Sequence, residues 1–345
     1  MAPDQPRVPA SVIVTAHNRR QFLRDAVESV LAQDVDQSKY EIVVVKNFPD
    51  TDLDHFLDRH GARRILSYDQ SPSLKVAEGI RACRGDIVLL LDDDDLFERS
   101  KLRVVLREFE AHPRLGFYHN QVSYIGQNGD PLAPGHSKVF GFRPAGRSRR
   151  VLLTNAAKDT GLAQVAFSYP DFNSSSLAIR RDLAVDSFPF LTRIEGGPDT
   201  FFFFVALLST YSLLLDNALL TRYRIHDENA SLAGGADRDE RRARLLAAAQ
   251  KQDLVNRVIR EMVVGSGDAL VLREIDARIL LTRLSILFRD LRSGRLEAAR
   301  AVLRAISLQR TLAMRENIPS VVGAMLFALT PRLARTTYEH RVSIR

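Results

Sequence analysis

Four consecutive aspartates, Asp92 to Asp95, are the residues of this chain whose type and spacing most directly suggest chemistry. They follow residues 87–91, an apolar run of strand length that fits a strand covered on both faces within a parallel sheet. Ligands of open α/β sheets bind outside the carboxyl ends of strands, so the four carboxylates would reach a cleft mouth. In an extended backbone, Asp92 and Asp94 would face one way and Asp93 the other. The pattern predicts a site for a hard divalent cation, because Mg²⁺ takes one or two carboxylates and leaves positions for water and substrate phosphates.

A solvated acidic loop is the alternative interpretation of these aspartates. The apolar strand that leads directly into them weakens it. Packing four like charges together is also destabilising unless a cation or protonation relieves the repulsion. We therefore favour the cation site.

The segments before the aspartates alternate between strand and helix patterns. Strands are expected at residues 11–15, 41–45 and 64–66, and helices at residues 21–33, 54–59 and 75–83. Such alternation points to right-handed βαβ units and a mostly parallel sheet that binds a nucleotide.

The segments after the aspartates continue this pattern less regularly. We expect a helix at 100–111 and strands at 117–125 and 173–180, with a long Gly-, Pro- and Arg-rich connection at 126–150. The apolar segments 213–215 and 219–224 then lead to His226. Such a connection is usually functional or mobile, although a plain solvated loop is equally compatible with it.

Asp199 is a second acidic residue in a distinctive place. Two glycines and a proline interrupt regular structure just before it, and the very apolar segment 200–209, a helix or a strand, follows. At the start of a helix, the macrodipole would favour the ionised carboxylate. A simple capping role is compatible with a chemical one. His226, by contrast, would on its own be interpreted as structural.

Composition sets broad limits on the protein. The 345 residues suffice for one large α/β domain with an appendage or for two domains, and 45% hydrophobic and 26% charged residues are ordinary for a globular protein. The net charge of +7 suits anionic small molecules or a phospholipid surface; the scattered arginines argue against a nucleic-acid site. The single cysteine, Cys83, excludes an internal disulfide framework.

The C-terminal part has a different character from residue 238 onward. Apolar spacing predicts two amphipathic helices, and residues 296–306 predict a third, which together describe an appended helical bundle. Residues 318–329 are apolar but shorter than the ~20 residues that cross a bilayer. With Arg332 and Arg335 they would suit peripheral binding to an anionic membrane, and packing on the preceding domain or oligomerisation through the helices is the alternative. Because the first residues lack the apolar segment of a secretory signal, we expect a cytoplasmic protein, with a peripheral position on the inner face of the membrane as an option.

Several motifs, in order along the chain, resemble those of the family 2 glycosyltransferases, which have the GT-A fold. Residues 11–20 (SVIVTAHNRR) look like the opening strand and its loop, and residues 85–95 (GDIVLLLDDDD) are similar to the strand and the DXD motif. Residues 223–231 (YRIHDENAS) are close to the family's later Tyr-Arg-x-His segment. The resemblance implies an α/β, GT-A type fold with a Rossmann-like, mostly parallel sheet flanked by helices and a C-terminal helical appendage. It implies a nucleotide-sugar-binding half at 1–125, an acceptor-binding half at 126–236 and a helical region at 237–345.

The resemblance also implies roles for individual residues. Mg²⁺ or Mn²⁺ would be held by Asp92 and Asp94, with Asp95 adjacent and His226 as a further ligand. The catalytic base would be Asp199, with Glu195 as the second candidate. Residues expected to bind the nucleotide-diphosphate sugar lie at the ends of the predicted strands and in the segments after them: Thr15, His17, Asn18, Arg19, Lys46, Lys75 and Asp93. Lys46 and Asn47 stand after the second strand, where family members usually carry an aspartate that contacts the base.

The expected activity is metal-dependent, inverting transfer of a sugar from a nucleotide-diphosphate sugar to a hydroxyl of a saccharide or lipid-linked acceptor. A sugar-phosphate nucleotidyltransferase is one alternative, but it would normally show a glycine-rich phosphate loop after the first strand, where this chain has Ala16 to Arg19. A non-catalytic subunit that binds sugar nucleotides is the other alternative.

Overall fold

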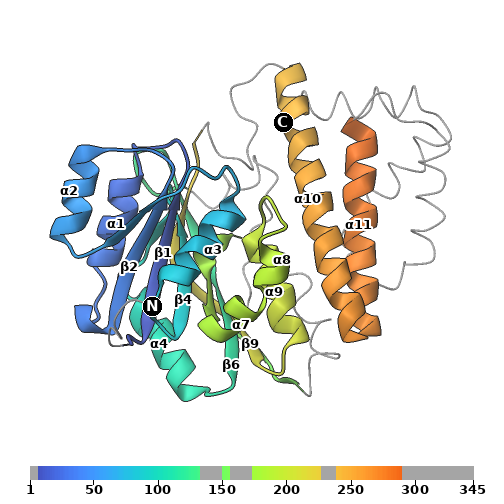
Figure 1. Ribbon diagram of the computed structural model, residues 1–345, viewed down its shortest axis with the longest axis horizontal. Helices are drawn as coiled ribbons and strands as arrows, with labels where there is room; N and C mark the ends of the chain where they lie inside the picture. The colour runs from blue at the N-terminus through green and yellow to red at the C-terminus, as the bar shows by residue number, and fades with distance from the viewer. Residues whose placement is uncertain (1–6, 133–149, 156–172, 227–237, 290–345) are drawn as a thin grey trace. The chain divides into compact units, whose positions relative to one another are not determined.

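The computed structural model describes residues 7–132, 150–155, 173–226 and 238–289 (Figure 1). The chain divides into two compact units. The first contains Met1–Ala133 and Ala145–Arg224, and the second contains Pro134–Pro144 and Ile225–Arg345. Each unit is treated by itself below.

The first unit is built on a nine-stranded sheet with the order β3-β2-β1-β4-β8-β6-β9-β5, and β7 also pairs with β9. The strands are β1 (Ala10–Ala16), β2 (Tyr40–Lys46), β3 (Arg63–Leu66), β4 (Ile87–Asp92), β5 (Leu96–Phe97), β6 (Leu115–Ile125), β7 (Val151–Leu153), β8 (Leu177–Arg180) and β9 (Ser212–Arg224). β1 to β4 are parallel, whereas β8 is antiparallel to both β4 and β6. β9 is parallel to β6 and antiparallel to β5 and β7. The predicted α/β class is confirmed, but the sheet is mixed, and only its first half is parallel throughout.

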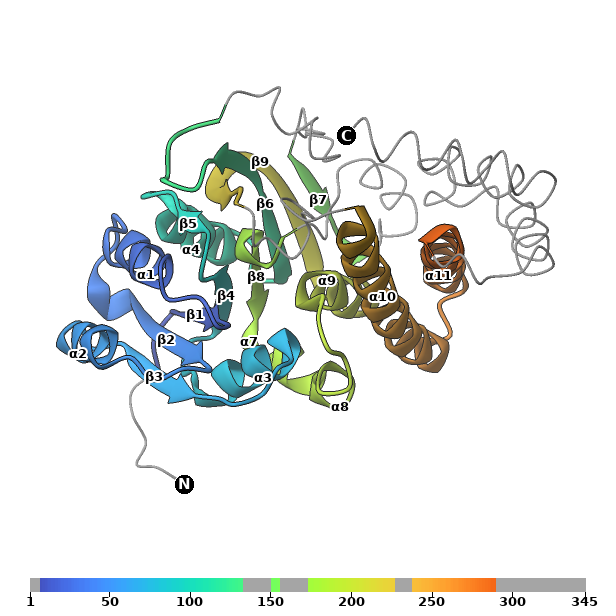
Figure 2. The ribbon, with the colours of Figure 1, turned by 90° about the horizontal axis from the view of Figure 1, so that it is seen from above.

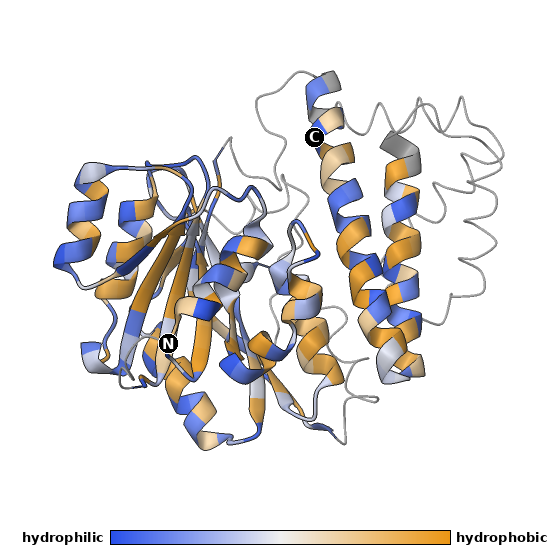
Figure 3. Cartoon of the chain, in the orientation of Figure 1, coloured by the Kyte–Doolittle hydropathy of each residue, from blue (hydrophilic) through white to orange (hydrophobic). Residues whose placement is uncertain are grey.

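Helices cover both faces of this sheet (Figure 2). One face carries α1 (Leu23–Leu31), α2 (Thr51–Arg59) and α4 (Lys101–Ala111), and the other carries α3 (Pro72–Ala82), α7 (Arg181–Asp186), α8 (Phe188–Leu191) and α9 (Pro198–Leu208). The described part of the unit also contains two short 3₁₀ turns, η1 (Gln37–Lys39) and η4 (Ser174–Ser176). The apolar residues of the central strands lie between these layers, as the orange strands of Figure 3 show. Strands buried on both faces explain the uninterrupted apolar runs of the sequence.

The segment left open as helix or strand is a helix, α9. Gly197 has a φ of 64°, the left-handed region that glycine adopts easily, and Pro198 occupies the first turn, where its fixed φ is preorganised for a helix. All four phenylalanines from Phe201 to Phe204 are at most 1% exposed. A helix buried all round shows no polar face in its sequence, which is why periodicity did not identify it.

The second unit contains two long helices, α10 (Arg238–Ser266) and α11 (Ala269–Arg289), which confirm the predicted C-terminal helices. Gly267, with a φ of 74°, makes the turn between them. The pair is held by buried aliphatic residues and by Arg260, whose Nε lies 2.6 Å from the Asp276 carboxylate. The predicted helix at 296–306 and the apolar segment 318–329 lie outside the described residues. Among the helices that are described, none combines the length and the apolar character needed to span a bilayer.

Candidate active site

The site is organised at the carboxyl ends of β1 and β4. These strands pair in parallel, with Thr15 opposite Asp92, while β2 lies on the far side of β1. The strand order therefore reverses at this point, and open α/β sheets bind ligands at such positions. Thr15 Oγ1 donates to Asp92 Oδ1 over 3.3 Å, and the Asp92 N–H donates to Ser175 Oγ over 3.0 Å. Both contacts fix the first aspartate at the strand end.

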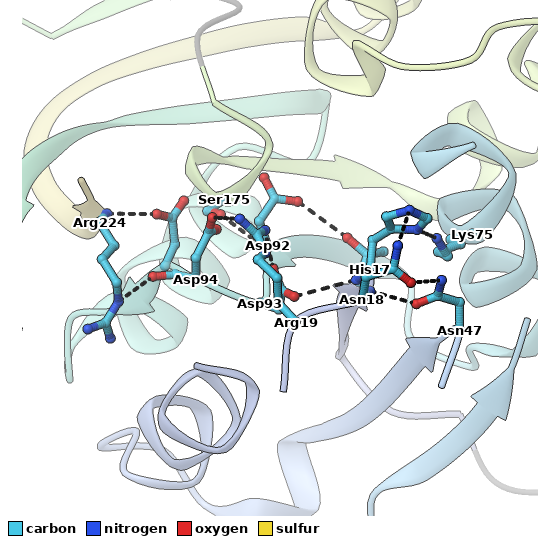
Figure 4. A network of polar contacts seen from close by, with 12 residues as sticks. His17, Asn18, Arg19, Asn47, Lys75, Asp92, Asp93, Asp94, Ser175 and Arg224 are labelled. Atoms are coloured by element: carbon cyan, nitrogen blue, oxygen red, sulfur yellow. Dashed lines mark hydrogen bonds and ion pairs between the residues drawn. The ribbon is translucent and has the colours of Figure 1, made fainter. Parts of the chain in front are cut away.

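The aspartates then leave the strand in a turn (Figure 4). β4 ends at Asp92, and the Asp95 N–H donates back to the Asp92 carbonyl over 3.2 Å. The predicted alternation of side chains was therefore wrong, because it assumed an extended backbone beyond Asp92. Instead, the Arg19 guanidinium contacts Asp93 and also lies 2.6 Å from Asp94 Oδ2.

Asp95 points into the protein. Its two oxygens accept from the Arg224 N–H and from Asn173 Nδ2, each over 3.0 Å. It is 1% exposed, and burial, followed by the charges of Asp94 and Asp92, raises its pKa well above the usual range. Two hydrogen bonds compensate part of the cost of burying this carboxyl group.

The neighbouring carboxyl groups also resist ionisation. Burial, reinforced by Asp94, raises the pKa of Asp92 to about 6. Burial raises the pKa of Asp93 to about 7, although its pairing with Arg19 acts in the opposite direction. A divalent cation bound at these oxygens would favour the ionised forms.

Within the described part of the chain, no three His, Cys, Asp or Glu side chains are grouped to hold a metal ion. A cation held by only two of these carboxylates would need water and phosphate as its remaining ligands, as is usual for Mg²⁺.

The loop after β1 joins this turn. The His17 N–H donates to Asp93 Oδ2 over 3.4 Å, and His17 Nδ1 lies 2.6 Å from Lys75 Nζ. Asn18, in the left-handed region with a φ of 59°, forms two hydrogen bonds with Asn47 at the end of β2. The structure thus brings together the predicted residues of the first strand end, the loop and α3.

Lys46 is directed elsewhere. Its Nζ donates to the Phe48 carbonyl over 2.6 Å and lies 2.8 Å from the Asp54 carboxylate, and the residue is 2% exposed. These contacts connect it to the start of α2. Its role in binding the nucleotide sugar stays a prediction.

Asp199 is connected to the aspartate turn through Asn173. Asp199 Oδ2 accepts from the Asn173 N–H over 3.1 Å, and Asp199 Oδ1 accepts from the Thr200 N–H over 2.9 Å. Since Asn173 Nδ2 donates to Asp95, a single residue contacts the carboxylates from both segments.

Glu195 lies exposed in the loop before α9. His226 falls at the start of the second unit and is 7% exposed, and its role as a metal ligand stays a prediction.

The family model described as Glycosyl transferase family 2 matches residues 11–170. Residues 11–170 therefore resemble the family 2 glycosyltransferases. The resemblance found in the sequence motifs is thereby confirmed.

Relatives of this domain support the assignment. An uncharacterized glycosyltransferase of Rickettsia conorii is 23% identical over 242 residues, which cover 65% of this chain and 40% of the relative. One from Nostoc sp. is 25% identical over 269 residues, covering 74% of this chain and 76% of the relative. The chain spans about 40% of the length of the Rickettsia conorii and Rickettsia felis relatives.

Solved structures similar to this chain show the fold. The crystal structure of S. aureus TarS 1–349 has a TM-score of 0.58 at 15% identity, with 97% of this chain and 90% of that one covered. The mannosyltransferase PcManGT from Pyrobaculum calidifontis, solved with GDP-Man and Mn²⁺, has a TM-score of 0.51 at 15% identity, with 94% of this chain and 88% of that one covered. The expected GT-A type fold is confirmed.

Three residues of the site were not identified from the sequence. Asn173 and Ser175 lie next to a predicted strand, and nothing in a single sequence marks them as partners of the aspartates. Arg224 lies within the Tyr-Arg-x-His motif, which is a signal for it. It is 1% exposed, and its Nε donates to the Asp94 carbonyl over 2.8 Å while its Nη1 donates to the Gln127 carbonyl over 2.6 Å. These three residues hold the aspartate turn in place through their hydrogen bonds.

Proposed function

We propose that this protein is a metal-dependent, inverting glycosyltransferase. It would move a sugar from a nucleotide-diphosphate sugar to a hydroxyl of a saccharide or lipid-linked acceptor. The match to the family 2 model supports sugar transfer as the reaction class. Similar structures were solved with UDP, with UDP-GlcNAc, and with GDP-Man and Mn²⁺, which supports the class of donor. The observation that carries the proposal is the position of Asn173, which contacts Asp95 and Asp199 at once.

Asp92 and Asp94 are the proposed metal ligands. A Mg²⁺ or Mn²⁺ ion bound there would supply charge to offset the negative charge that develops on the departing nucleoside diphosphate. Both oxygens of Asp95 already accept hydrogen bonds, so its main contribution would be to fix the turn. Arg19, which bridges Asp93 and Asp94, and the nearby Lys75 would hold the diphosphate.

Asp199 is the proposed general base. It stands in the first turn of α9, where the helix macrodipole and two backbone N–H donors favour the ionised carboxylate. The carboxylate would accept the proton of the acceptor hydroxyl as that oxygen attacks the anomeric carbon. Attack opposite the departing diphosphate inverts that centre. Glu195, exposed just before α9, is the second candidate.

The role of Asp199 can be tested with two isosteric variants. The full chain would be assayed for Mn²⁺-dependent transfer with a panel of UDP- and GDP-sugars, and binding of each would be followed by thermal shift. Asp199→Asn should retain binding and lose transfer by about 10²- to 10⁴-fold, the usual contribution of a general base. Glu195→Gln is the matched control and should retain transfer. Full activity of Asp199→Asn, with loss in Glu195→Gln, would move the base to Glu195.

The metal assignment has its own test. Removal of divalent cations with EDTA should abolish transfer, and added Mn²⁺ or Mg²⁺ should restore it. Asp94→Ala should remove the stabilisation that a nucleoside diphosphate with Mn²⁺ gives to the wild type. Unchanged nucleotide affinity in this variant would contradict a metal site at Asp94.

A further inference from the structure

The hydrogen bonds around His17 have a fixed direction that starts at a backbone amide. The Asn18 N–H can only donate, and it donates to the Asn47 side chain over 2.8 Å. The accepting atom must be the Asn47 carbonyl oxygen, so the Asn47 NH₂ group donates to Asn18 Oδ1 over 2.7 Å. The Asn18 amide is fixed in turn, with its oxygen toward Asn47 and its NH₂ group toward His17 (Figure 4).

The donor-to-acceptor direction of these hydrogen bonds also determines which nitrogen of the His17 ring carries the proton. Asn18 Nδ2 lies 3.2 Å from His17 Nε2, and because an amide NH₂ group can only donate, Nε2 must be the accepting nitrogen. A neutral imidazole that accepts at Nε2 carries its proton on Nδ1. His17 Nδ1 therefore presents an N–H to Lys75 Nζ, 2.6 Å away.

Lys75 Nζ has to accept a hydrogen bond from this N–H. An ammonium group carries three donors and no acceptor, whereas a neutral amine has a lone pair. Lys75 is 1% exposed. Burial lowers its pKa, while Asp69 before α3, Asp93 after β4 and Glu78 on α3 itself act in the opposite direction. Burial and hydrogen-bond direction thus favour the same form of this side chain.

We propose that the ligand-free site holds His17 as its Nδ1–H tautomer against a neutral Lys75 amine, and that a nucleoside diphosphate binds together with one proton taken from solvent onto Lys75. The choice of this anion rests on the proposed function. A diphosphate adds negative charge near the lysine and so favours the ammonium form. An ammonium group can no longer accept from His17 Nδ1–H. Protonation must therefore break the His17–Lys75 contact, or move the ring proton to Nε2 and break the contact with Asn18.

Asn47→Asp is the variant that reverses the donor-to-acceptor direction of the hydrogen bonds between Asn18 and His17. An aspartate still accepts from the Asn18 N–H but cannot donate to Asn18 Oδ1, so the Asn18 amide has to rotate and present its oxygen to His17 Nε2. The ring proton then moves to Nε2, and Nδ1 accepts from a charged Lys75. Asn128→Asp, at an exposed turn position, makes the same chemical change away from the site and is the matched control.

The first measurement needs no ligand. Long-range ¹H–¹⁵N NMR spectra of the full chain distinguish histidine tautomers, and His17→Gln assigns the signal among the eight histidines. We expect the Nδ1–H tautomer in the wild type and in Asn128→Asp, and the Nε2–H tautomer in Asn47→Asp. An Nε2–H tautomer in the wild type would overturn the proposal whatever reaction the protein performs, even if Asn47→Asp failed to fold.

The second measurement counts protons. Calorimetric titration of the Mg²⁺-saturated protein with UDP and with GDP, in buffers of different ionisation enthalpy, gives the number of protons bound with the nucleotide. At a pH of about 8 an ordinary lysine is already charged and takes up none. We expect an uptake approaching about one proton in the wild type and in Asn128→Asp, falling toward zero in Asn47→Asp. Binding without proton uptake in the wild type would overturn the coupling, and failure of both nucleotides to bind would instead contradict the proposed function together with the coupling.

Discussion

Asn173 offers the sharpest test of how the site is held together. Its side chain donates to the buried Asp95 carboxyl group over 3.0 Å, and its Oδ1 accepts from the Ser175 N–H over 2.7 Å. Its φ of 71° is positive, which strains any residue with a Cβ but not glycine. Side-chain bonding and backbone conformation can be separated by comparing substitutions to alanine and to glycine.

The structure gives the size of each effect. Loss of the bond to Asp95 leaves a buried acceptor unsatisfied, at a cost of about 1–3 kcal/mol. Loss of the cap on η4 adds about 1 kcal/mol in the alanine variant and a few tenths in the glycine variant. Alanine tolerates the positive φ less well than asparagine, which adds up to about 1 kcal/mol, and glycine has no such strain. Asn173→Ala should therefore lower the free energy of unfolding by about 2–5 kcal/mol, and Asn173→Gly by about 1–3 kcal/mol.

Urea unfolding of the full chain, followed by circular dichroism because the chain contains no tryptophan, would measure both values. The exposed Asn128, changed to alanine and to glycine, provides the matched pair, and both changes should stay within about 0.5 kcal/mol of the wild type. If Asn173→Gly were as unstable as Asn173→Ala, the conformational part of the reasoning would be refuted. If both stayed within about 1 kcal/mol of the wild type, the bond to Asp95 would be irrelevant to stability.

Three further predictions concern single residues of the first unit. A Cβ at Gly85 would lie 2.4 Å from backbone atoms of β1, whereas one at Gly196 meets nothing within 4 Å. In a thermal or urea melt, Gly85→Ala should therefore lower the free energy of unfolding by about 3 kcal/mol or more, and Gly196→Ala should leave it almost unchanged. Arg224→Met should lower the free energy of unfolding by about 3–5 kcal/mol, because it removes a 1% exposed cation from the carbonyl of the buried Asp94. Arg222→Met, which breaks a partly exposed ion pair, should lower it by about 1 kcal/mol or less, and equal losses would contradict this ranking. Arg19→Met should tighten Mn²⁺ binding to the nucleotide-free protein by about tenfold, because the guanidinium that competes with the cation for two carboxylates is removed. Electron paramagnetic resonance titrations would measure the affinity, and weaker Mn²⁺ binding would refute this competition between Arg19 and the cation.

The elements that the sequence predicted well are those with strong local signals. β1, β2 and β4 are buried on both faces, and their uninterrupted apolar runs distinguish them from the flanking helices. The aspartates at the end of β4 and the loop after β1 could be assigned to one site, because parallel strands expose their carboxyl ends at the same edge.

The second half of the sheet depends on pairings that no local pattern specifies. β9 is one strand of 13 residues that contacts β5, β6 and β7, and the sequence did not identify it. Its parallel pairing with β6 contains register shifts, which obscure the alternation of apolar residues. The mixed character of the sheet follows from these long-range contacts.

Side-chain roles near the aspartates were missed for a related reason. A sequence does not show that β4 ends at Asp92, so the turn and the shared contact of Asp93 and Asp94 with Arg19 could not be predicted. The positive φ of Asn173 gives no signal in a single sequence, since asparagine is also common in ordinary turns. Its partners come from segments 78 and 26 residues away.

The phenylalanines of α9 have a consequence for the proposed chemistry. A helix enclosed on every side has almost no freedom to shift or tilt within a close-packed interior, so the carboxylate in its first turn is anchored as firmly as the core itself. On the proposed assignment, Asp199 would not travel toward a hydroxyl. A bound saccharide would have to bring its hydroxyl to a stationary base, and regioselectivity would follow from how that saccharide is oriented rather than from adjustment by the protein.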